Sequence, residues 1–362
     1  MSALARDLGT SLLSGGLAFD DDHELFRESV RGFISRDVAP SYAHWRSAGA
    51  IPTEIFTAAA EYGFLSLGIP ELLGGTGVDD PRFAVILVEE CLHSGLSGLG
   101  LSVAIHNGVC IPFLRRFGSE EQQQRWLPAL ASGRYMAAVI DGAGLSCNGG
   151  SLTAELNGGP GTAGASLLFV TAEPAGHVLI IDAHDSAVTT RPDSRGFIGV
   201  NEAPGITVQL ADHRPAETEG TDALVRSTNA WMAVVHAAGA HAALRLATEY
   251  VFERRVFGQP LANMENTKTV LGDAAAQTCA ATELAYRTAT DHAEGGARAA
   301  AARHVAAAAH RRNADIGLQL HGGYGYMREY PIAQAYADAA VLTSAPWIGA
   351  RAEHSVAAAL GL

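Results

Sequence analysis

The chain has 362 residues, of which 48% are hydrophobic and 17% charged, and its formal net charge is −13. A chain of this length and composition can bury a large core and by length holds two or three domains. The acidic balance argues against a nucleic acid or an anionic membrane as partner, because no basic field attracts phosphate groups. We therefore expect no nucleic-acid partner and no membrane partner.

Cysteines and histidines indicate neither a disulfide framework nor a metal centre. No two cysteines form a CxxC pair, so we expect free thiols in a reducing compartment, and the four are Cys91, Cys110, Cys147 and Cys279. His236 and His241 are five residues apart, which is not the i, i+4 spacing of a helical metal pair. The segment Met1–Gly16 has no basic region ahead of a long apolar run, and no apolar run appears long enough to span a membrane. We expect a cytoplasmic protein with no metal site.

Residues 1–134 are predicted to form an N-terminal helical domain. Phe26, Val30 and Phe33 recur at the i, i+4, i+7 spacing of one helix face, and this helix is expected to stop before Pro40. The further helix signals are a start near Pro52 and an end at Gly63, an end at Phe117-Gly118 with glycine after the last turn, and a capping box of Ser119 and Gln122.

Residues 135–220 have a different character and predict a small middle β domain. Short apolar runs alternate with Gly, Pro, Asn and Asp, which is typical of strands and turns. The turn 156–159, Leu-Asn-Gly-Gly, is a hairpin signal. The clearest strands are Ser166–Thr171, His177–Asp182 and Gly205–Leu210.

Residues 221–362 are rich in alanine and predict a C-terminal helical bundle. The long helix candidates are Thr228–Val256, Asn266–Thr290 and Gly295–His321. Small side chains let helix axes approach closely, so the simplest arrangement is a four-helix bundle. The fold class is therefore α+β, with helices, a small β domain and a helical bundle in that order.

Five segments in this order resemble the acyl-CoA dehydrogenase family, flavoproteins that oxidise acyl thioesters at Cα and Cβ. Residues 254–258, Arg-Arg-Val-Phe-Gly, are similar to the family's RxxFG motif. The other similar segments are the Pro-Glu…Gly-Gly turn at 68–77, the Phe-Gly-Ser-Glu-Glu-Gln helix at 117–128, the Gln-Leu-His-Gly-Gly run at 319–326, and Arg-Glu-Tyr-Pro at 328–331.

The resemblance implies an FAD cofactor whose ADP portion lies against a neighbouring subunit. It implies that Arg254 pairs with the pyrophosphate, that Phe257 lies against the flavin cofactor across a dimer interface, and that Gln319 hydrogen-bonds the cofactor. Gly322 and Gly323 would let the backbone approach the adenosine diphosphate. We expect a homo- or hetero-oligomer, as a dimer or tetramer, with an acyl thioester of coenzyme A or of an acyl carrier protein as substrate.

The sequence departs from the family at the catalytic base, which must be a carboxylate held close to the substrate Cα. The family places this glutamate at one of two positions, and here they carry Thr228 and Pro346. The nearest alternative carboxylates are Asp141 and Glu353. The catalytic residues are therefore unknown.

The cofactor surroundings differ as well. A segment similar to the family's TEPxAGSD stretch is shortened, with Asp141, Gly144 and Ser146 as its recognisable residues. Trp347 replaces a glycine that passes near the flavin, and Ile348 replaces a threonine. Glu265 stands where many relatives have glutamine, and its charge would repel a pyrophosphate unless a cation screens it.

Three hypotheses remain open from the sequence. The first is a repurposed enzyme that keeps an acyl pocket but catalyses another reaction. The second is a non-catalytic subunit of a hetero-oligomeric acyl-CoA dehydrogenase, which contributes part of a shared cofactor site. The third is an active dehydrogenase with a relocated base.

Overall fold

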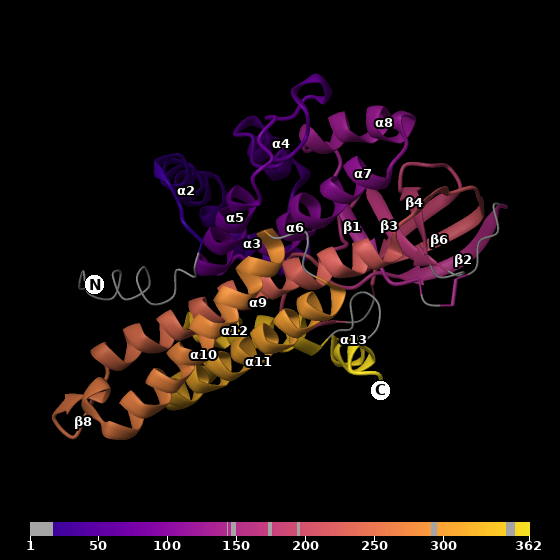
Figure 1. The fold of residues 1–362 in the computed structure, drawn as a ribbon. Helices are drawn as coiled ribbons and strands as arrows, with labels where there is room; N and C mark the ends of the chain where they lie inside the picture. Colours follow the sequence, from indigo (N-terminus) through magenta and orange to yellow (C-terminus); the bar gives the residue numbers. More distant parts are fainter. Residues whose placement is uncertain are drawn as a thin grey trace.

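A computed structural model of the chain describes residues 17–142, 144–145, 150–172, 176–193, 196–290, 295–344 and 352–362. Helices come first, two packed sheets follow, and long helices form the remainder (Figure 1). This arrangement confirms the predicted α+β architecture, with a helical N-terminal part, a small β domain and a helical bundle.

The helices of the first part pack around one apolar core. Their bounds are α2 (Asp21–Phe33), the π-helical turn η1 (Ile34–Val38), α3 (Ala39–Ala48), α4 (Thr53–Glu61), the 3-10 turn η2 (Glu71–Leu73), α5 (Pro81–His93), α6 (Ser97–Ile105), the π-helical turn η3 (His106–Cys110), α7 (Ile111–Phe117) and α8 (Glu120–Ala131).

Pro40 and Pro112 lie within continuous helical runs without ending them. The π-helical turn η1 comes directly before the helix that carries Pro40, and η3 comes directly before the helix that carries Pro112. A proline lacks the N–H group and its ring crowds the carbonyl four residues earlier, so a wider turn accommodates it. The expectation that the first helix stops before Pro40 is therefore wrong, since the chain stays helical from Asp21 to Ala48.

The helical run Ser97–Phe117 is long and apolar enough to cross a membrane, contrary to the expectation from the sequence. However, 89% of its most apolar window is buried inside the protein. It packs against α5 and α9 (Thr221–Glu253), and Trp231 of α9 lies directly over Gly108. The run is therefore the central helix of the core.

The helix end at Phe117 and the capping box after it are both as predicted. The Ser119 side chain accepts a hydrogen bond from the Gln122 N–H at 3.2 Å, and the Gln122 side chain accepts one from the Ser119 N–H. Gly118 is extended rather than left-handed, with φ −71° and ψ 143°. Glycine is needed there because a Cβ atom would lie 2.5 Å from the Leu114 carbonyl oxygen.

The β domain is a sandwich of two sheets. Its strands are β1 (Ala137–Ile140), β2 (Leu152–Asn157), β3 (Leu167–Ala172), β4 (His177–Asp182), β5 (Val188–Pro192), β6 (Ile206–His213) and β7 (Ala216–Glu219). One sheet has the order β1-β3-β4-β7 and the other β2-β6-β5. All pairs are antiparallel except β1 with β3. The first sheet packs one face on the second sheet and the other on the helical core, so β1 and β3 are buried on both faces.

The hairpin predicted at residues 156–159 does not form. β2 pairs with β6 instead, and Gly158 donates its N–H to the Ile206 carbonyl at 2.8 Å. The register places Leu156 opposite Val208, and both side chains lie in the core between the sheets. A strand that buries one face in this way selects its partner by the core and not by the local turn.

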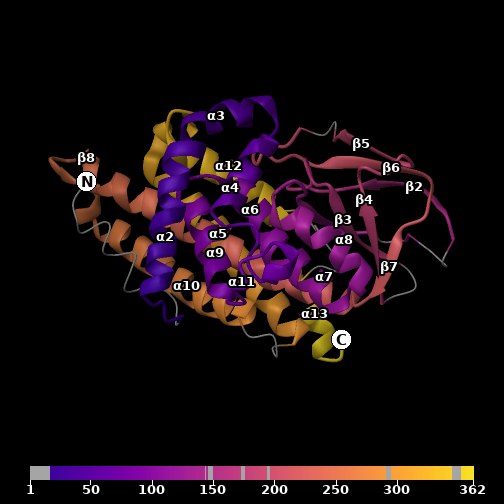
Figure 2. The same ribbon diagram turned by 90° about the horizontal axis from the view of Figure 1, so that it is seen from above.

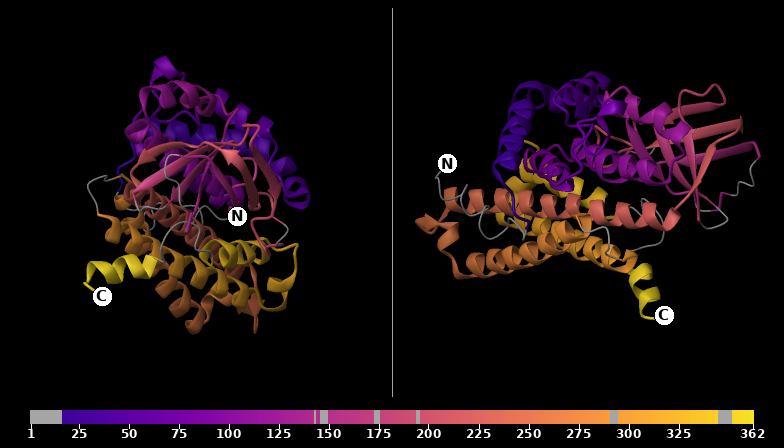
Figure 3. Two further views of the ribbon diagram at one scale, coloured as in Figure 1. Left: turned by 90° about the vertical axis from the view of Figure 1, so that its right-hand side faces the viewer. Right: turned by 45° about the horizontal axis from the view of Figure 1, so that its top comes forward.

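The long helices form a bundle whose closely packed interior is rich in alanine, as the sequence predicts. The elements of this part are α9, the short strands β8 (Arg255–Val256) and β9 (Gln259–Pro260), the 3-10 turn η4 (Leu261–Asn263), α10 (Glu265–Thr290), α11 (Gly296–His321), the 3-10 turn η5 (Gly322–Tyr326), α12 (Pro331–Ser344) and α13 (Ala352–Ala359). At 33 residues α9 is about 50 Å long, since each residue adds 1.5 Å. It starts beside the β domain and ends at the β8–β9 hairpin, which lies at the opposite end of the molecule (Figures 1 and 2). The right-hand view of Figure 3 shows the same separation.

Two buried carboxylates join the three parts of the chain. Glu202, in the loop before β6, accepts hydrogen bonds from the Tyr42 hydroxyl at 2.5 Å and from the Gly98 N–H at 2.8 Å. Asp338 of α12 accepts one from the Val200 N–H at 2.8 Å. Val200 has a positive φ of 54°, a strained conformation for a β-branched residue, so this bond helps to hold the loop. We call these residues the carboxylate latch.

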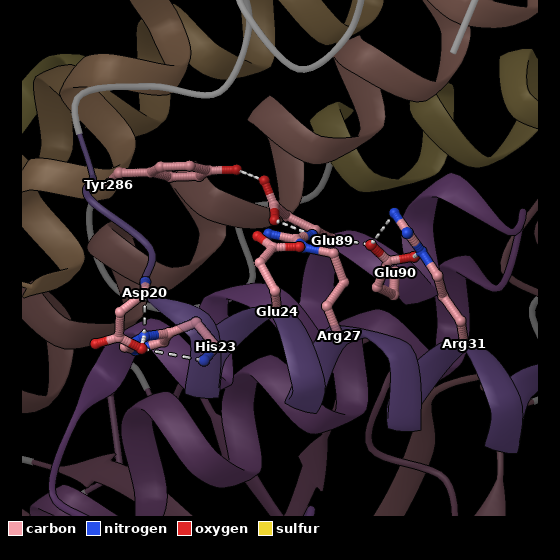
Figure 4. Close-up of polar contacts among 8 residues, drawn as sticks. All are labelled: Asp20, His23, Glu24, Arg27, Arg31, Glu89, Glu90 and Tyr286. Atoms are coloured by element: carbon pink, nitrogen blue, oxygen red, sulfur yellow. Dashed lines mark hydrogen bonds and ion pairs between the residues drawn. The ribbon is translucent and has the colours of Figure 1, made fainter. Parts of the chain in front are cut away.

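A second buried network connects α2, α5 and α10 (Figure 4). Arg27 of α2 donates to Glu89 at 2.9 Å and to Glu90 at 2.8 Å, and Arg31 donates to Glu90 at 2.8 Å. The Tyr286 hydroxyl donates to the other oxygen of Glu89. Burial raises the pKa of Glu89 to about 7, although Arg27 acts in the opposite direction. Complete burial of a carboxylate therefore outweighs one good ion pair here.

Candidate functional site

The residues predicted to contact a cofactor gather at the end of the bundle remote from the β domain. We call this end, residues 250–265 and 319–330, the bundle tip. The hairpin of β8 and β9 closes through Phe257 and Gly258, whose φ angles of 49° and 82° are both positive. Two residues with positive φ are typical of a type I′ turn, which suits glycine but strains phenylalanine. The Phe257 side chain is 96% exposed, so contacts within the chain do not explain its place there.

Arg254 and the glycine pair are brought together by ring stacking between α9 and α11. The Tyr250 ring stacks on the His321 ring with 3.8 Å between centroids. This contact places Arg254 over the ring of Tyr324, 5.7 Å from its centroid, in the turn that contains Gly322 and Gly323. Arg254 forms no ion pair in the part of the chain that the structure describes, so its charge is available to another molecule.

The glycine pair leaves open space beside its backbone. Gly322 has φ 58°, and a Cβ atom added at either Gly322 or Gly323 would meet no atom within 4 Å. Packing within this chain therefore does not require Gly323, whereas a molecule approaching the backbone closely would. Gln319 lies exposed in the last turn of α11, before this pair.

The carboxylate of Glu265 lies at the same tip and is partly screened. Its side chain is 89% exposed, and the Lys268 ammonium is 3.9 Å from its carboxylate. The bundle tip thus combines an unpaired guanidinium, accessible glycine backbone and an exposed aromatic ring. These features fit a cofactor that carries both phosphates and a planar ring system.

At the position of the family base on the helix, the structure shows hydrogen bonds but no carboxylate. Thr228 is buried in α9, and its hydroxyl donates to the Leu224 carbonyl at 2.8 Å. Its neighbour Asn229 accepts a hydrogen bond from the Arg303 guanidinium of α11 at 3.0 Å. Burial lowers the pKa of Arg303 to about 10. The other base position, Pro346, lies outside the described residues, as do Ser146, Trp347 and Ile348.

Both alternative carboxylates already have partners. Asp141, directly after β1, accepts a hydrogen bond from the Thr171 hydroxyl at 3.2 Å. Glu353 of α13 is exposed, and its carboxylate lies 3.2 Å from the His304 ring. Gly144 is left-handed with φ 81°, as a turn after β1 requires.

A pair of buried histidines was missed by the sequence analysis. His236 of α9 and His310 of α11 approach to 3.4 Å between their Nδ1 atoms in the bundle interior. Burial lowers the pKa of both, and that of His310 to about 4, so both rings are neutral near pH 7. The two residues are 74 positions apart, so no local spacing could have paired them. Within the described ranges, no group of three His, Cys, Asp or Glu side chains could hold a metal ion.

Architecture and site define a three-part α+β fold, in which a helical domain and a β sandwich precede a helical bundle whose tip suits a phosphate-bearing cofactor. Residues 20–134 match the model of the acyl-CoA dehydrogenase N-terminal domain, and residues 224–346 match that of its C-terminal domain. The chain belongs to the acyl-CoA dehydrogenase family, which is FAD-dependent.

Similar proteins support this assignment along nearly the whole chain. The mitochondrial long-chain specific acyl-CoA dehydrogenase of Sus scrofa is 28% identical over 358 residues, which cover 89% of this chain and 83% of that protein. An acyl-CoA dehydrogenase from Geobacillus kaustophilus has the same fold, with a TM-score of 0.84, 22% identity, and coverage of 95% of this chain and 99% of that one. An acyl-CoA dehydrogenase from Bacillus anthracis, solved as a complex with FAD, has a TM-score of 0.81 and 20% identity. The match covers 96% of this chain and 68% of that one.

Proposed function

We propose that this chain is an FAD-binding subunit of an acyl-CoA dehydrogenase-type oligomer, and that it contributes cofactor contacts to a neighbouring subunit without catalysing ordinary α,β-dehydrogenation itself. The observation that carries this proposal is the position of the bundle tip. Its cofactor-contact residues face solvent at the end of α9 that is remote from the chain's own β domain. They are Arg254, Phe257, Gln319, Gly322 and Gly323.

The length of α9 supports a site shared between subunits. From Arg226 to Arg254 the helix rises about 42 Å, since each residue adds 1.5 Å. A cofactor held by the bundle tip cannot also reach the β domain of the same chain across that distance. A second subunit, placed against the tip, would bring its own β domain to these residues.

Each residue of the bundle tip has a defined task in this proposal. Arg254 would pair with phosphate oxygens, and its stacking on Tyr324 fixes the plane of the guanidinium. The backbone at Gly322 and Gly323 would pack closely on the adenosine diphosphate portion. Phe257 would bury its exposed ring against the flavin portion or the neighbouring subunit, which offsets the strain of its positive φ. Bound FAD would supply the hydride-accepting group that the protein lacks.

The residues at the base position on α9 support the proposed lack of ordinary dehydrogenase activity. The Thr228 hydroxyl already donates to a backbone carbonyl, and a hydroxyl group is too weak a base for an α-proton at neutral pH. Neither Asn229 nor the Arg303 that contacts it accepts a proton. This part of the chain therefore offers hydrogen-bond donors where the family reaction needs an acceptor of protons.

The same donors favour a second candidate function, repurposed catalysis on an acyl thioester or related substrate. A buried guanidinium stabilises a developing negative charge, which is the opposite task to proton abstraction. The carrier would be coenzyme A or an acyl carrier protein.

A visible spectrum of the purified chain tests the proposal. After incubation with FAD and desalting, we expect a retained flavin band and an oligomer by light scattering. Octanoyl-CoA should leave the flavin band unbleached. Arg254→Gln should lose most of the flavin, whereas Arg312→Gln, which removes an exposed arginine of α11 with an ion-pair partner in Asp273, should retain it. Bleaching by octanoyl-CoA would establish a relocated base and overturn the non-catalytic assignment, and an oligomer that retains no flavin would overturn the cofactor assignment.

A further inference from the structure

A cavity of about 300 Å³ lies between the helical domain and the start of α9, away from the bundle tip. Its walls come from the start of α5, from α7, from the first turns of α9 and from the end of α10. Leu67, Phe113 and Trp231 supply apolar surface. This volume is at the lower end of the range for small-molecule sites, which span roughly 300–1,000 Å³.

Trp231 closes the inner side of the cavity. A Cβ atom on Gly108 would lie 2.1 Å from the indole ring, so the indole packs directly on the η3 backbone. α9 and η3 are thereby in close contact, and the indole forms part of the cavity wall. The cavity therefore suits a short apolar body.

Two arginines of the cavity carry unbalanced charge, while its acidic residues are neutralised. Asp79 pairs with Arg115 through two hydrogen bonds of 2.9 and 3.2 Å. Asp80 pairs with Arg82 at 2.6 Å and lies 3.3 Å from the His23 ring.

Arg116 and Arg226 have no carboxylate partner in the described part of the chain. Arg116 lies over the Phe117 ring at 5.2 Å, and Arg226 is half-buried on the first turns of α9. Burial and the charge of Arg116 lower the pKa of Arg226. The two positive charges repel each other, so an anion bound between them in the cavity would be stabilised.

We propose that this cavity binds a small organic anion with an apolar body, held by its carboxylate on Arg116 and Arg226 and by its hydrocarbon on Trp231 and Phe113. A charge-assisted hydrogen bond to a half-buried guanidinium supplies the specificity, and the apolar wall supplies contact area. The site is about 42 Å along α9 from Arg254, so it goes beyond the proposed cofactor function and is tested without FAD.

Calorimetric titration of the flavin-free full chain with three probes tests this assignment. We expect hexanoate to bind, 1-hexanol to bind at least about tenfold more weakly because it lacks the charge, and inorganic phosphate to bind more weakly than hexanoate because it lacks the apolar body. Equal affinity for hexanoate and 1-hexanol, or no binding of hexanoate, would overturn the proposal. Phosphate binding as tightly as hexanoate would also overturn it.

Substitutions then locate the bound anion. Arg226→Met keeps an apolar side chain of similar length, and we expect it to weaken hexanoate about ten- to a hundredfold while leaving 1-hexanol unchanged. Arg116→Gln should weaken hexanoate in the same direction. The control is Arg311→Met, a half-buried helical arginine of α11 that contacts Tyr336 and lies outside the cavity. Circular dichroism checks that each variant is folded. An equal decrease in the affinity for hexanoate in all three variants would contradict the assignment.

Discussion

The buried carboxylate of Glu89 makes a quantitative prediction about pH. Its pKa is about 7 in the folded chain against an ordinary value of 4.5, and one pKa unit corresponds to about 1.4 kcal/mol. Between these two values the folded state holds more protons than the unfolded state, so stability falls as the pH rises. The wild-type protein should lose about 3 kcal/mol through this group between pH 4.5 and pH 7.

Glu89→Gln removes this dependence while leaving an uncharged side chain of the same shape beside Tyr286. We expect the free energy of unfolding of the variant, minus that of the wild type, to increase by about 3 kcal/mol from pH 5 to pH 8. Urea unfolding monitored by circular dichroism gives the free energy of unfolding of both proteins at pH 5 and at pH 8. The difference between variant and wild type at each pH cancels the contributions of groups that the two proteins share.

Glu28→Gln is the matched control, because it removes an exposed carboxylate from α2 and leaves the buried network of Arg27 and Glu89 intact. A difference for Glu89→Gln that stays constant, or that decreases toward pH 8, would refute the reasoning. It would mean that the ion pair with Arg27 outweighs the burial of the carboxylate.

Three further predictions follow from packing, backbone conformation and the buried histidines. Gly108→Ala should destabilise the protein by about 1–3 kcal/mol, because its methyl group collides with Trp231. Gly272→Ala, on an open face of α10, should stabilise the protein by up to about 1 kcal/mol. Urea unfolding measures the free energy of unfolding of both variants. Phe257→Asn should relieve the positive φ and leave the isolated chain equally or more stable, yet weaken its self-association and FAD retention, as measured by light scattering and absorbance. Acidification from pH 7 to pH 5 should lower the urea midpoint, because buried histidines with lowered pKa bind protons on unfolding. They outnumber Glu89 and Asp338, whose raised pKa changes stability in the opposite direction. A higher midpoint at pH 5 would contradict this. The histidines are His93, His106, His236, His241, His310 and His321.

The helices were predictable because their signals are local. The alanine-rich composition located α10 and α11 within a residue or so, at 266–290 and 295–321 against the observed 265–290 and 296–321. The third candidate, Thr228–Val256, starts seven residues too late and runs into β8, since α9 spans Thr221–Glu253. The capping box of Ser119 worked for the same reason. The predicted helix end before Pro40 was wrong because the π-helical turn that accommodates this proline has no signature in the sequence.

Strand pairing and the geometry of the site were harder to predict from the sequence, because both depend on contacts between residues far apart in the chain. β4 was placed correctly from its apolar run, but β5 was missed, since it is an exposed strand with almost no apolar pattern. The partner of β2 was set by burial between sheets and not by the turn that follows it. Likewise, the sequence could suggest Arg254 and Phe257 as cofactor contacts, whereas their exposure at a remote tip depends on how the bundle is connected.

The carboxylate latch has a consequence for how the chain unfolds. Tyr42 and Gly98 donate to Glu202, and Val200 donates to Asp338 in addition to Gln334 of α12 itself. Separating the three parts of the chain would therefore remove buried hydrogen bonds from both carboxylates. Separation of the three parts therefore costs free energy before any of them unfolds. A single calorimetric transition, in which the van't Hoff and calorimetric enthalpies agree, is the behaviour that such a chain shows despite its length.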